Sequence, residues 1–196
     1  GAKDSNDRTQ EAILKMMVMG GKGSVVDSLL DLHLVPLAIS YEYDPCDFLK
    51  AQEFQLKRDI PGWKKSAQDD ILSMQTGIMG YKGHIHYHAA PCIDAWLREL
   101  PADTPKADIF RIIAEHIDRE IHAHYQLFPS NFVALDMLQD NGAHADKYSA
   151  ADKAQFEKYL AGQLAKIQIE NKDEAYLREC ILKMYANPAI NQLALA

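Results

Sequence analysis

The sequence is poor in cysteine and in basic charge, and it contains no long apolar run. Its three cysteines, Cys46, Cys92 and Cys180, are widely spaced and form no C-x-x-C motif, which argues against a disulfide framework or a zinc ribbon and favours a reducing, cytosolic setting. With 21 Lys and Arg against 28 Asp and Glu, the net charge of −7 gives no general attraction for nucleic acid. Because no segment approaches the ~18–20 apolar residues that cross a bilayer, we expect no membrane-spanning helix.

The sequence does contain enough apolar residues for a core. They make up 47% of the 196 residues, which suits one domain of ordinary size or one domain with a helical extension. Residues 34–41 and 80–89 indicate strands, the first apolar and buried, the second alternating. We therefore predict an α/β class, with a partial mixed sheet and flanking helices over residues 1–100 and an all-helical region over residues 101–196. Because two strands alone make a weak sheet, we expect further strands upstream of Gly1 in a longer protein.

Helix signals are spread along the whole chain. Asp7 or Thr9 is placed to cap a first helix, and residues 46–77 indicate one or two more. Thr104-Pro105 indicates another helix start, because proline at the first helical position loses no hydrogen bond. The remaining expected starts are residue 25, Pro129, the Ser149-x-x-Asp152 capping box and Asn171-x-x-Glu174, and isoleucines at positions 109, 113, 117 and 121 mark one buried helix face.

Four segments carry a resemblance to one family. Residues 34–43, LVPLAISYEY, resemble the fourth conserved block of the glycerol-3-phosphate and 1-acylglycerol-3-phosphate acyltransferases, a strand of the form (I/V)-V-P-(V/I)-x-I-x-Y. Residues 2–10, AKDSNDRTQ, are similar to the end of the phosphate-binding block that precedes it, whose core is E-G-(G/T)-R-S. Residues 83–93, GHIHYHAAPCI, resemble a later strand ending in G-x-P-(I/L). Residues 125–135, YQLFPSNFVAL, resemble a T-P-(S/T)-x-L-V-A stretch of the helical region in the glycerol-3-phosphate branch.

The resemblance implies transfer of an acyl group from a coenzyme A or acyl-carrier-protein thioester to a hydroxyl of glycerol 3-phosphate or its monoacyl form, in phospholipid synthesis. The family's mechanism uses a His-x4-Asp pair, in which histidine is the general base and aspartate orients it. None of the eight histidines here has an aspartate five positions on. We therefore expect no catalytic residue in this chain, place the pair and the phosphate-block core upstream, and expect the chain alone to be inactive. The family implies no metal or organic cofactor.

The resemblance also nominates residues that bind the substrate. Lys3 and Arg8 match the trailing basic positions of the phosphate-binding block and would hold glycerol phosphate; the alternative is that both are solvated charges. Tyr41 and Glu42 follow the end of the predicted strand, where ligands gather in open α/β sheets. For them the alternative is an ordinary polar loop.

Two further patterns raise other functions. His84, His86 and His88 alternate along a predicted strand, but a straight strand holds the outer two about 13 Å apart, too far for one zinc ion, so a polar strand face is the simpler interpretation. The only basic cluster could dock an acyl carrier protein, coenzyme A phosphates or anionic lipid at the inner face of the membrane, or could be a solvated helix face. It comprises Lys50, Lys57, Arg58, Lys64 and Lys65, interleaved with Phe48, Phe54 and Trp63.

Three functions therefore remain open. The first is the acyltransferase fragment, expected in the cytoplasm or peripheral to the membrane. The second is a non-catalytic helical binding or assembly domain, and the third is a metal-binding protein that uses the histidine-rich strand. Missing upstream strands would also leave apolar sheet edges, so we expect the chain to self-associate.

Overall fold

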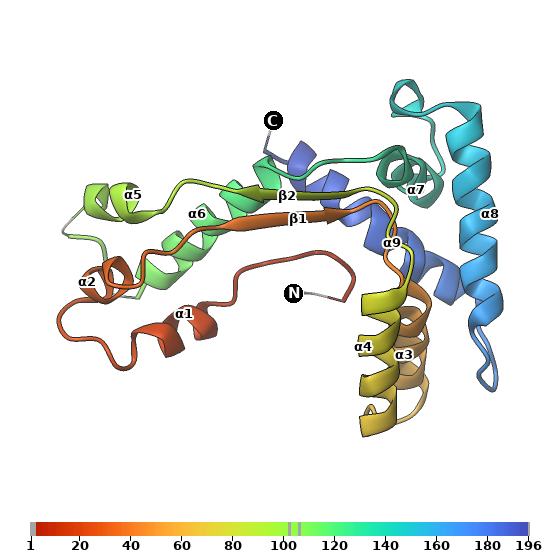
Figure 1. The fold of residues 1–196 in the computed structure, drawn as a ribbon, viewed down its shortest axis with the longest axis horizontal. Helices are drawn as coiled ribbons and strands as arrows, with labels where there is room; N and C mark the ends of the chain where they lie inside the picture. Colours follow the sequence, from red (N-terminus) through yellow and green to blue (C-terminus); the bar gives the residue numbers. More distant parts are fainter. Residues whose placement is uncertain (1–2, 102, 106, 196) are drawn as a thin grey trace.

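A computed structural model describes residues 3–101, 103–105 and 107–195, and these form a mixed α/β structure dominated by helices (Figure 1). The sheet has two antiparallel strands, β1 (Leu37–Tyr41) and β2 (Ile85–Ala89), with Ile39 opposite Tyr87. Helices gather at both ends of this ribbon, and the N-terminal segment runs beside β1 (Figure 1).

Four helices gather at one end of the sheet. They are α1 (Glu11–Val18), α2 (Val25–Leu30), α5 (Asp94–Glu99) and α6 (Ile109–Ala123). The smaller of two cores lies between them and is made of Leu14, Leu29, Ile93, Leu97, Ile113 and Ala114. Ile113 is fully buried and Ile109 and Ile117 pack beside it, so the isoleucine stripe does form the inner face of α6, as its spacing predicts.

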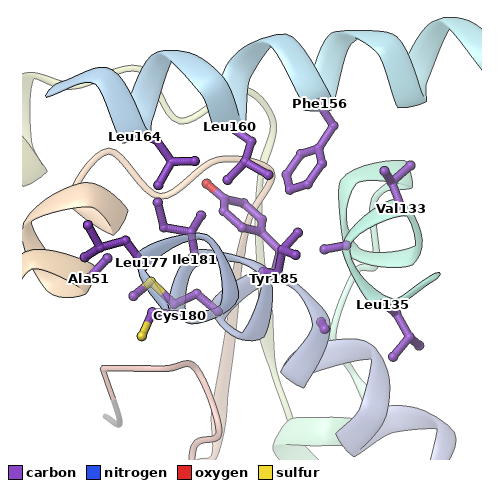
Figure 2. Close-up of a cluster of buried hydrophobic side chains, with 14 of the residues drawn as sticks. Ala51, Val133, Leu135, Phe156, Leu160, Leu164, Leu177, Cys180, Ile181 and Tyr185 are labelled. Carbon is purple, nitrogen blue, oxygen red and sulfur yellow. The ribbon is translucent and has the colours of Figure 1, made fainter. Parts of the chain in front are cut away.

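The larger core lies at the other end, around α9. The helices there are α3 (Asp47–Asp59), α4 (Ala67–Met79), α7 (Pro129–Gln139), the short 3₁₀ helix η1 (Ala145–Lys147), α8 (Ala150–Lys166) and α9 (Glu174–Leu193). Leu177, Ile181 and Tyr185 of α9 point into the centre, where they meet Leu160 and Phe156 of α8 (Figure 2). These five side chains are almost completely buried, so the C-terminal helix is the axis of this half of the molecule.

Several predicted boundaries are confirmed. The two helices within residues 46–77 appear as α3 and α4, and Pro129 is the first residue of α7. Ser149 and Asp152 form the predicted capping box: Ser149 Oγ accepts a hydrogen bond from the backbone N–H of Asp152 at 3.1 Å, and Asp152 Oδ2 accepts one from that of Ser149 at 2.8 Å. Ser24 and Ser66 make the same box at α2 and α4.

Three predicted helix starts or caps are wrong. The Thr104 hydroxyl donates back to the carbonyl of Pro101 at 2.6 Å, which closes a turn, and α6 begins only at Ile109. Neither Asp7 nor Thr9 caps α1, because the helix begins after Gln10, which makes no side-chain cap; the backbone N–H of Thr9 instead donates to Asp118 of α6 at 2.7 Å. The cap of α9 is Asp173 rather than the expected Asn171.

The strand predicted at residues 34–41 is confirmed as β1 over Leu37–Tyr41, but the prediction that it is buried is wrong for one of its two faces. Only the inward face of β1 is covered: Ala38 and Ser40 are buried, whereas Leu37, Ile39 and Tyr41 are 47%, 41% and 40% exposed. The reason is that the described helices pack on one face of the sheet, with α6 against β1 and the backbone N–H of Gln126 on Ser40 Oγ at 3.0 Å.

Both cores cross the predicted boundary near residue 100. The larger core joins Tyr43 and Ala51 to residues after 130, and the smaller core joins Leu14 and Leu97 to Ile113. Nothing in this packing separates residues 1–100 from residues 101–196 as independent units, and the division stays a prediction. Within the described part of the chain, no helix has the length and apolarity that crossing a membrane requires.

Candidate functional site

The N-terminal segment is held by side chains from the far end of the chain. His122 of α6 donates Nε2–H to the carbonyl of Asp7 at 3.0 Å, which fixes the ring tautomer. Asn187 of α9 donates to the carbonyl of Asp4 at 2.8 Å, and Arg8 donates to Asn191 Oδ1 at 3.2 Å. Residues 4–9 therefore lie in a defined position between β1, α6 and α9 rather than in a free loop.

A cavity of about 410 Å³ lies between this segment, β1 and α9, and we call it the β1 cavity. It brings together two of the predicted substrate-binding residues, Lys3 and Tyr41, although 38 positions separate them in the sequence. The other lining residues are Ser5, Asp7, Ile39, Ser40, Asp44, Lys50, Tyr125, Gln126, Asn131, Met184, Tyr185 and Pro188. Such a mixed apolar and polar lining, open at one side, is typical of sites for small ligands.

Arg8 lines a second, adjoining cavity of about 370 Å³, which shares Asp7, Ile39 and Tyr125 with the β1 cavity. The two cavities therefore meet along β1, with Arg8 at one end and Lys3 at the other. Burial raises the pKa of the Tyr125 hydroxyl at their junction above its ordinary value, so this group is a neutral hydrogen-bond donor or acceptor.

The cations beside the β1 cavity are partly neutralised. Lys3 pairs with the buried carboxylate of Glu53, which Lys57 also contacts at 2.8 Å. Two ammonium groups thus share one carboxylate, and the trio keeps one positive charge. Lys50 pairs with Asp44 at 2.6 Å, so those two side chains cancel. An incoming anion would compete with Glu53 for Lys3 rather than meet an unpaired cation.

Glu42, the fourth predicted binding residue, is not among the described residues that line either cavity. Strand alternation turns it away from Tyr41. Its carboxylate accepts a hydrogen bond from the backbone N–H of His84 at 2.9 Å and pairs with His84 Nδ1 at 2.6 Å. The structure therefore places Glu42 where it ties the end of β1 to the segment before β2.

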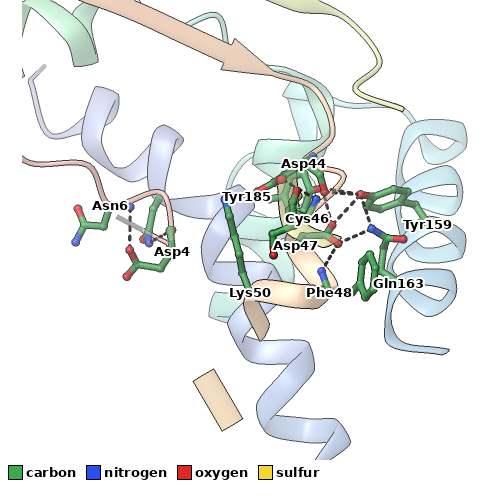
Figure 3. A network of polar contacts seen from close by, with 12 residues as sticks. Asp4, Asn6, Asp44, Cys46, Asp47, Phe48, Lys50, Tyr159, Gln163 and Tyr185 are labelled. Atoms are coloured by element: carbon green, nitrogen blue, oxygen red, sulfur yellow. Dashed lines mark hydrogen bonds and ion pairs between the residues drawn. The ribbon is translucent and has the colours of Figure 1, made fainter. Parts of the chain in front are cut away.

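The buried carboxylate of Asp47 lies at the start of α3, in a polar network that includes Tyr185 (Figure 3). Asp47 Oδ2 accepts hydrogen bonds from Tyr159 at 2.7 Å and Tyr185 at 2.8 Å, and Gln163 donates to Oδ1. Burial raises the pKa of Asp47 to about 6, and the hydrogen bonds from the two tyrosines and the glutamine oppose that rise. Because Tyr185 also lines the cavity, this network sets the position of the cavity wall.

His86 and His88 lie on one face of β2, as the alternation predicts, and His84 precedes the strand, but the three histidines do not converge. His84 pairs with Glu42, whereas the ring of His88 stacks on that of His124 with centroids 3.9 Å apart. The rings of His86 and His88 are 6.5 Å apart. Among the described residues, His84, His86 and His88 belong to no group of three side chains whose ligand atoms could share a metal ion.

The predicted basic cluster does not form an unpaired basic surface. Lys65 pairs with Asp70 at 3.0 Å, and Arg58 pairs with both Asp59 and Asp173 while lying 4.0 Å over the ring of Tyr176. Phe48 and Phe54 pack against the larger core. Most of the cluster's charge is thus used within the molecule, although all of these pairs remain partly exposed.

Sequence reasoning missed the cavity walls that come from distant segments. Met184, Tyr185 and Pro188 belong to α9, and no local pattern links a C-terminal helix to a strand more than 140 positions earlier. Asn131 could have been proposed from the sequence, because it follows Pro129-Ser130 in the segment that resembles the family. It donates to the carbonyl of Tyr185 at 2.8 Å and so joins α7 to α9 at the cavity.

Comparison with known proteins found no match to the chain among family models, curated proteins or solved structures. The acyltransferase resemblance therefore rests on the four sequence segments.

Proposed function

We propose that this chain is the C-terminal part of a glycerolipid acyltransferase, with an acyltransferase-type α/β region followed by a helical extension. The enzyme would move an acyl group from a coenzyme A or acyl-carrier-protein thioester to glycerol 3-phosphate or its monoacyl form, in phospholipid synthesis. It would work in the cytoplasm, at or near the inner face of the membrane. The catalytic histidine and aspartate would come from a segment outside these 196 residues.

One observation carries the proposal. The two segments that resemble consecutive family blocks, residues 2–10 and 34–43, border the same pair of adjoining cavities. Lys3 and Tyr41, 38 positions apart in the sequence, line one cavity, and Arg8 lines the other. Residues that bind one substrate must lie near one another, and adjoining cavities that share Asp7, Ile39 and Tyr125 support such an arrangement.

The side chains suggest a division of tasks. Arg8 would bind the phosphate through two N–H groups, since guanidinium matches phosphate geometry, and Lys3 would add charge when the phosphate displaces Glu53. Tyr41 and Tyr125 would supply hydroxyls to the glycerol part. The hydroxyl that attacks the thioester would lose its proton to the upstream histidine.

The test uses the complete gene product in an acyl-transfer assay with glycerol 3-phosphate. Arg8→Ala should raise KM for the acceptor by about 10- to 100-fold, because a hydrogen bond to a charged group contributes about 1.5–3 kcal/mol, and Arg8→Lys should recover part of the loss. Lys15→Ala is the matched control, since Lys15 is an exposed cation paired with Glu11 on α1, outside both cavities.

One result would end the proposal, and another would remove Arg8 from it. One is a complete gene product that transfers no acyl group to any glycerol phosphate acceptor. The other is an Arg8→Ala enzyme with an unchanged KM and a normal melting temperature, which would remove Arg8 from the site even if activity were found.

A binding or assembly role is the second candidate, and the exposed apolar face of the sheet favours it. Leu37, Ile39, Tyr41, Ile85 and Tyr87 lie on this face, and each is at least 40% exposed. An apolar face of this kind usually contacts another protein surface. The two candidates differ in the assay, because an assembly domain would bind a partner without transferring any acyl group.

A further inference from the structure

Two loops meet at the end of the sheet opposite the larger core. His33 follows α2, whereas Cys92 and Asp94 lie between β2 and the first turn of α5. The backbone N–H of Ile93 donates to the carbonyl of Leu34 at 3.0 Å, which holds the two loops side by side. Helices α2 and α5 also pack against each other there (Figure 1). His33 therefore lies beside Cys92 and Asp94, although at least 59 positions separate it from them in the sequence.

The three side chains converge. His33 Nδ1 lies 2.6 Å from Asp94 Oδ2, and the ligand atoms of His33, Cys92 and Asp94 all lie within 4.8 Å of one another. Zinc bonds of about 2.0–2.3 Å in a tetrahedral site place ligand atoms about 3.3–3.8 Å apart. The group therefore needs only small side-chain movements to enclose an ion, in contrast to the histidines of β2.

The backbone conformation of His33 directs its side chain towards Asp94. Its φ of 48° lies in the left-handed region, which non-glycine residues seldom adopt. The imidazole is aimed at Asp94 by this backbone turn, and its side chain remains 71% exposed, so an ion can reach it from solvent.

Asp94 offers an unused buried acceptor. Its Oδ1 is buried and, among the described residues, has no hydrogen-bond partner, whereas Oδ2 contacts His33. An unsatisfied buried acceptor is costly, and a cation would satisfy it. The His33 imidazole, with a smaller effect from the Cys92 thiol, holds the pKa of the Asp94 carboxyl below its ordinary value. The exposed Arg98, whose Nη2 is 3.9 Å from Oδ2, is the cation that competes.

We propose that His33, Cys92 and Asp94 form a zinc-binding site, with water as the fourth ligand. Imidazole nitrogen, thiolate sulfur and carboxylate oxygen are all ligands that zinc accepts, and the thiolate favours zinc over magnesium or calcium. Binding replaces the hydrogen bond from His33 Nδ1–H to Asp94 Oδ2 with two metal bonds: the neutral imidazole then carries its one proton on Nε2, and the Cys92 thiol gives its proton to solvent as it binds as the thiolate. The site lies away from the β1 cavity and joins the segment before β1 to α5.

The test titrates the reduced, metal-free 196-residue chain with Zn²⁺ and, as a spectroscopic probe, with Co²⁺. We expect one equivalent of either ion and a thiolate-to-cobalt charge-transfer band. Cys92→Ser should abolish the band, and His33→Ala and Asp94→Asn should weaken binding by at least about 10- to 100-fold, the loss seen when even indirect ligand contacts are removed.

The chain provides matched controls. His84→Ala removes another exposed histidine that pairs with a carboxylate at the same 2.6 Å, and Cys46→Ser removes another partly buried thiol. Both variants should bind one equivalent with unchanged affinity and keep the charge-transfer band. The proposal is overturned if the unmodified chain binds no stoichiometric metal, or if Cys92→Ser binds as tightly as the unmodified chain.

Discussion

Replacing Asp47 by asparagine should change how the stability of this protein depends on pH. The carboxyl group is fully buried at the start of α3 and accepts hydrogen bonds from Tyr159 and Tyr185 (Figure 3). Burial dominates these hydrogen bonds and raises its pKa from an ordinary 3.8 to about 6. Asparagine has nearly the same shape but no titrating proton, so the variant isolates the effect of the charge.

The direction and size follow from that shift. An acid with a higher pKa in the folded chain keeps its proton better when folded, so the folded state gains stability at low pH and loses this gain as pH rises through about 6. The difference between 3.8 and about 6 corresponds to about 3 kcal/mol. The stability of the parent protein relative to Asp47→Asn should therefore fall by about 3 kcal/mol between about pH 3 and about pH 7.

Urea denaturation of both proteins across this pH range measures the difference directly. Asp152→Asn provides a control of opposite sign: the hydrogen bonds that this exposed carboxyl makes with Ser149 lower its pKa below 3.8, so the parent should gain stability over the variant as pH rises to about 4 and change little above that. A parent-minus-variant difference for Asp47 that stays constant with pH would refute the reasoning, because it would show that burial does not govern this carboxyl.

The other predictions concern the core, a helix cap and the exposed sheet face. Phe156→Ala should lower the free energy of unfolding by about 3–5 kcal/mol, since the ring is 1% exposed in the larger core; a loss below about 1 kcal/mol in urea denaturation would contradict this packing. Ser149→Ala should cost about 1 kcal/mol through the lost capping box, measured in the same way, whereas Ser149→Asn should cost less. The chain should self-associate through the apolar sheet face, and Ile39→Lys with Tyr87→Lys should reduce the sedimentation coefficient towards that of a monomer; a parent chain that is already monomeric at high concentration would sink this prediction.

Much of the local structure was readable in the sequence. The Ser149–Asp152 box, Pro129 at the first turn of α7 and the isoleucines of α6 each act through neighbours within one or two helical turns. The alternation along β2 likewise predicted which side chains share a face. Each of these features depends only on residues that are close together in the sequence.

The failures came where a distant partner decided the outcome. Thr9 looked like a cap but bonds to Asp118, and residues 37–41 looked buried on both sides but are covered on one. Likewise, the sequence suggested His84, His86 and His88 as metal ligands. The side chains that do converge are those of His33, Cys92 and Asp94, and no sequence motif singled out His33.

The sequence by itself therefore determined most helices, the Ser149 cap and the apolar face of α6, because propensity, capping and periodicity act over a few residues. Only the tertiary structure decided which segments meet: Lys3 and Tyr41 beside α9, Arg8 beside α6, and His33 beside Cys92 and Asp94. The first two meetings arise because α6 and α9 hold residues 4–8 from more than 100 positions away. The third arises because α2 packs on α5 and the N–H of Ile93 donates to the carbonyl of Leu34.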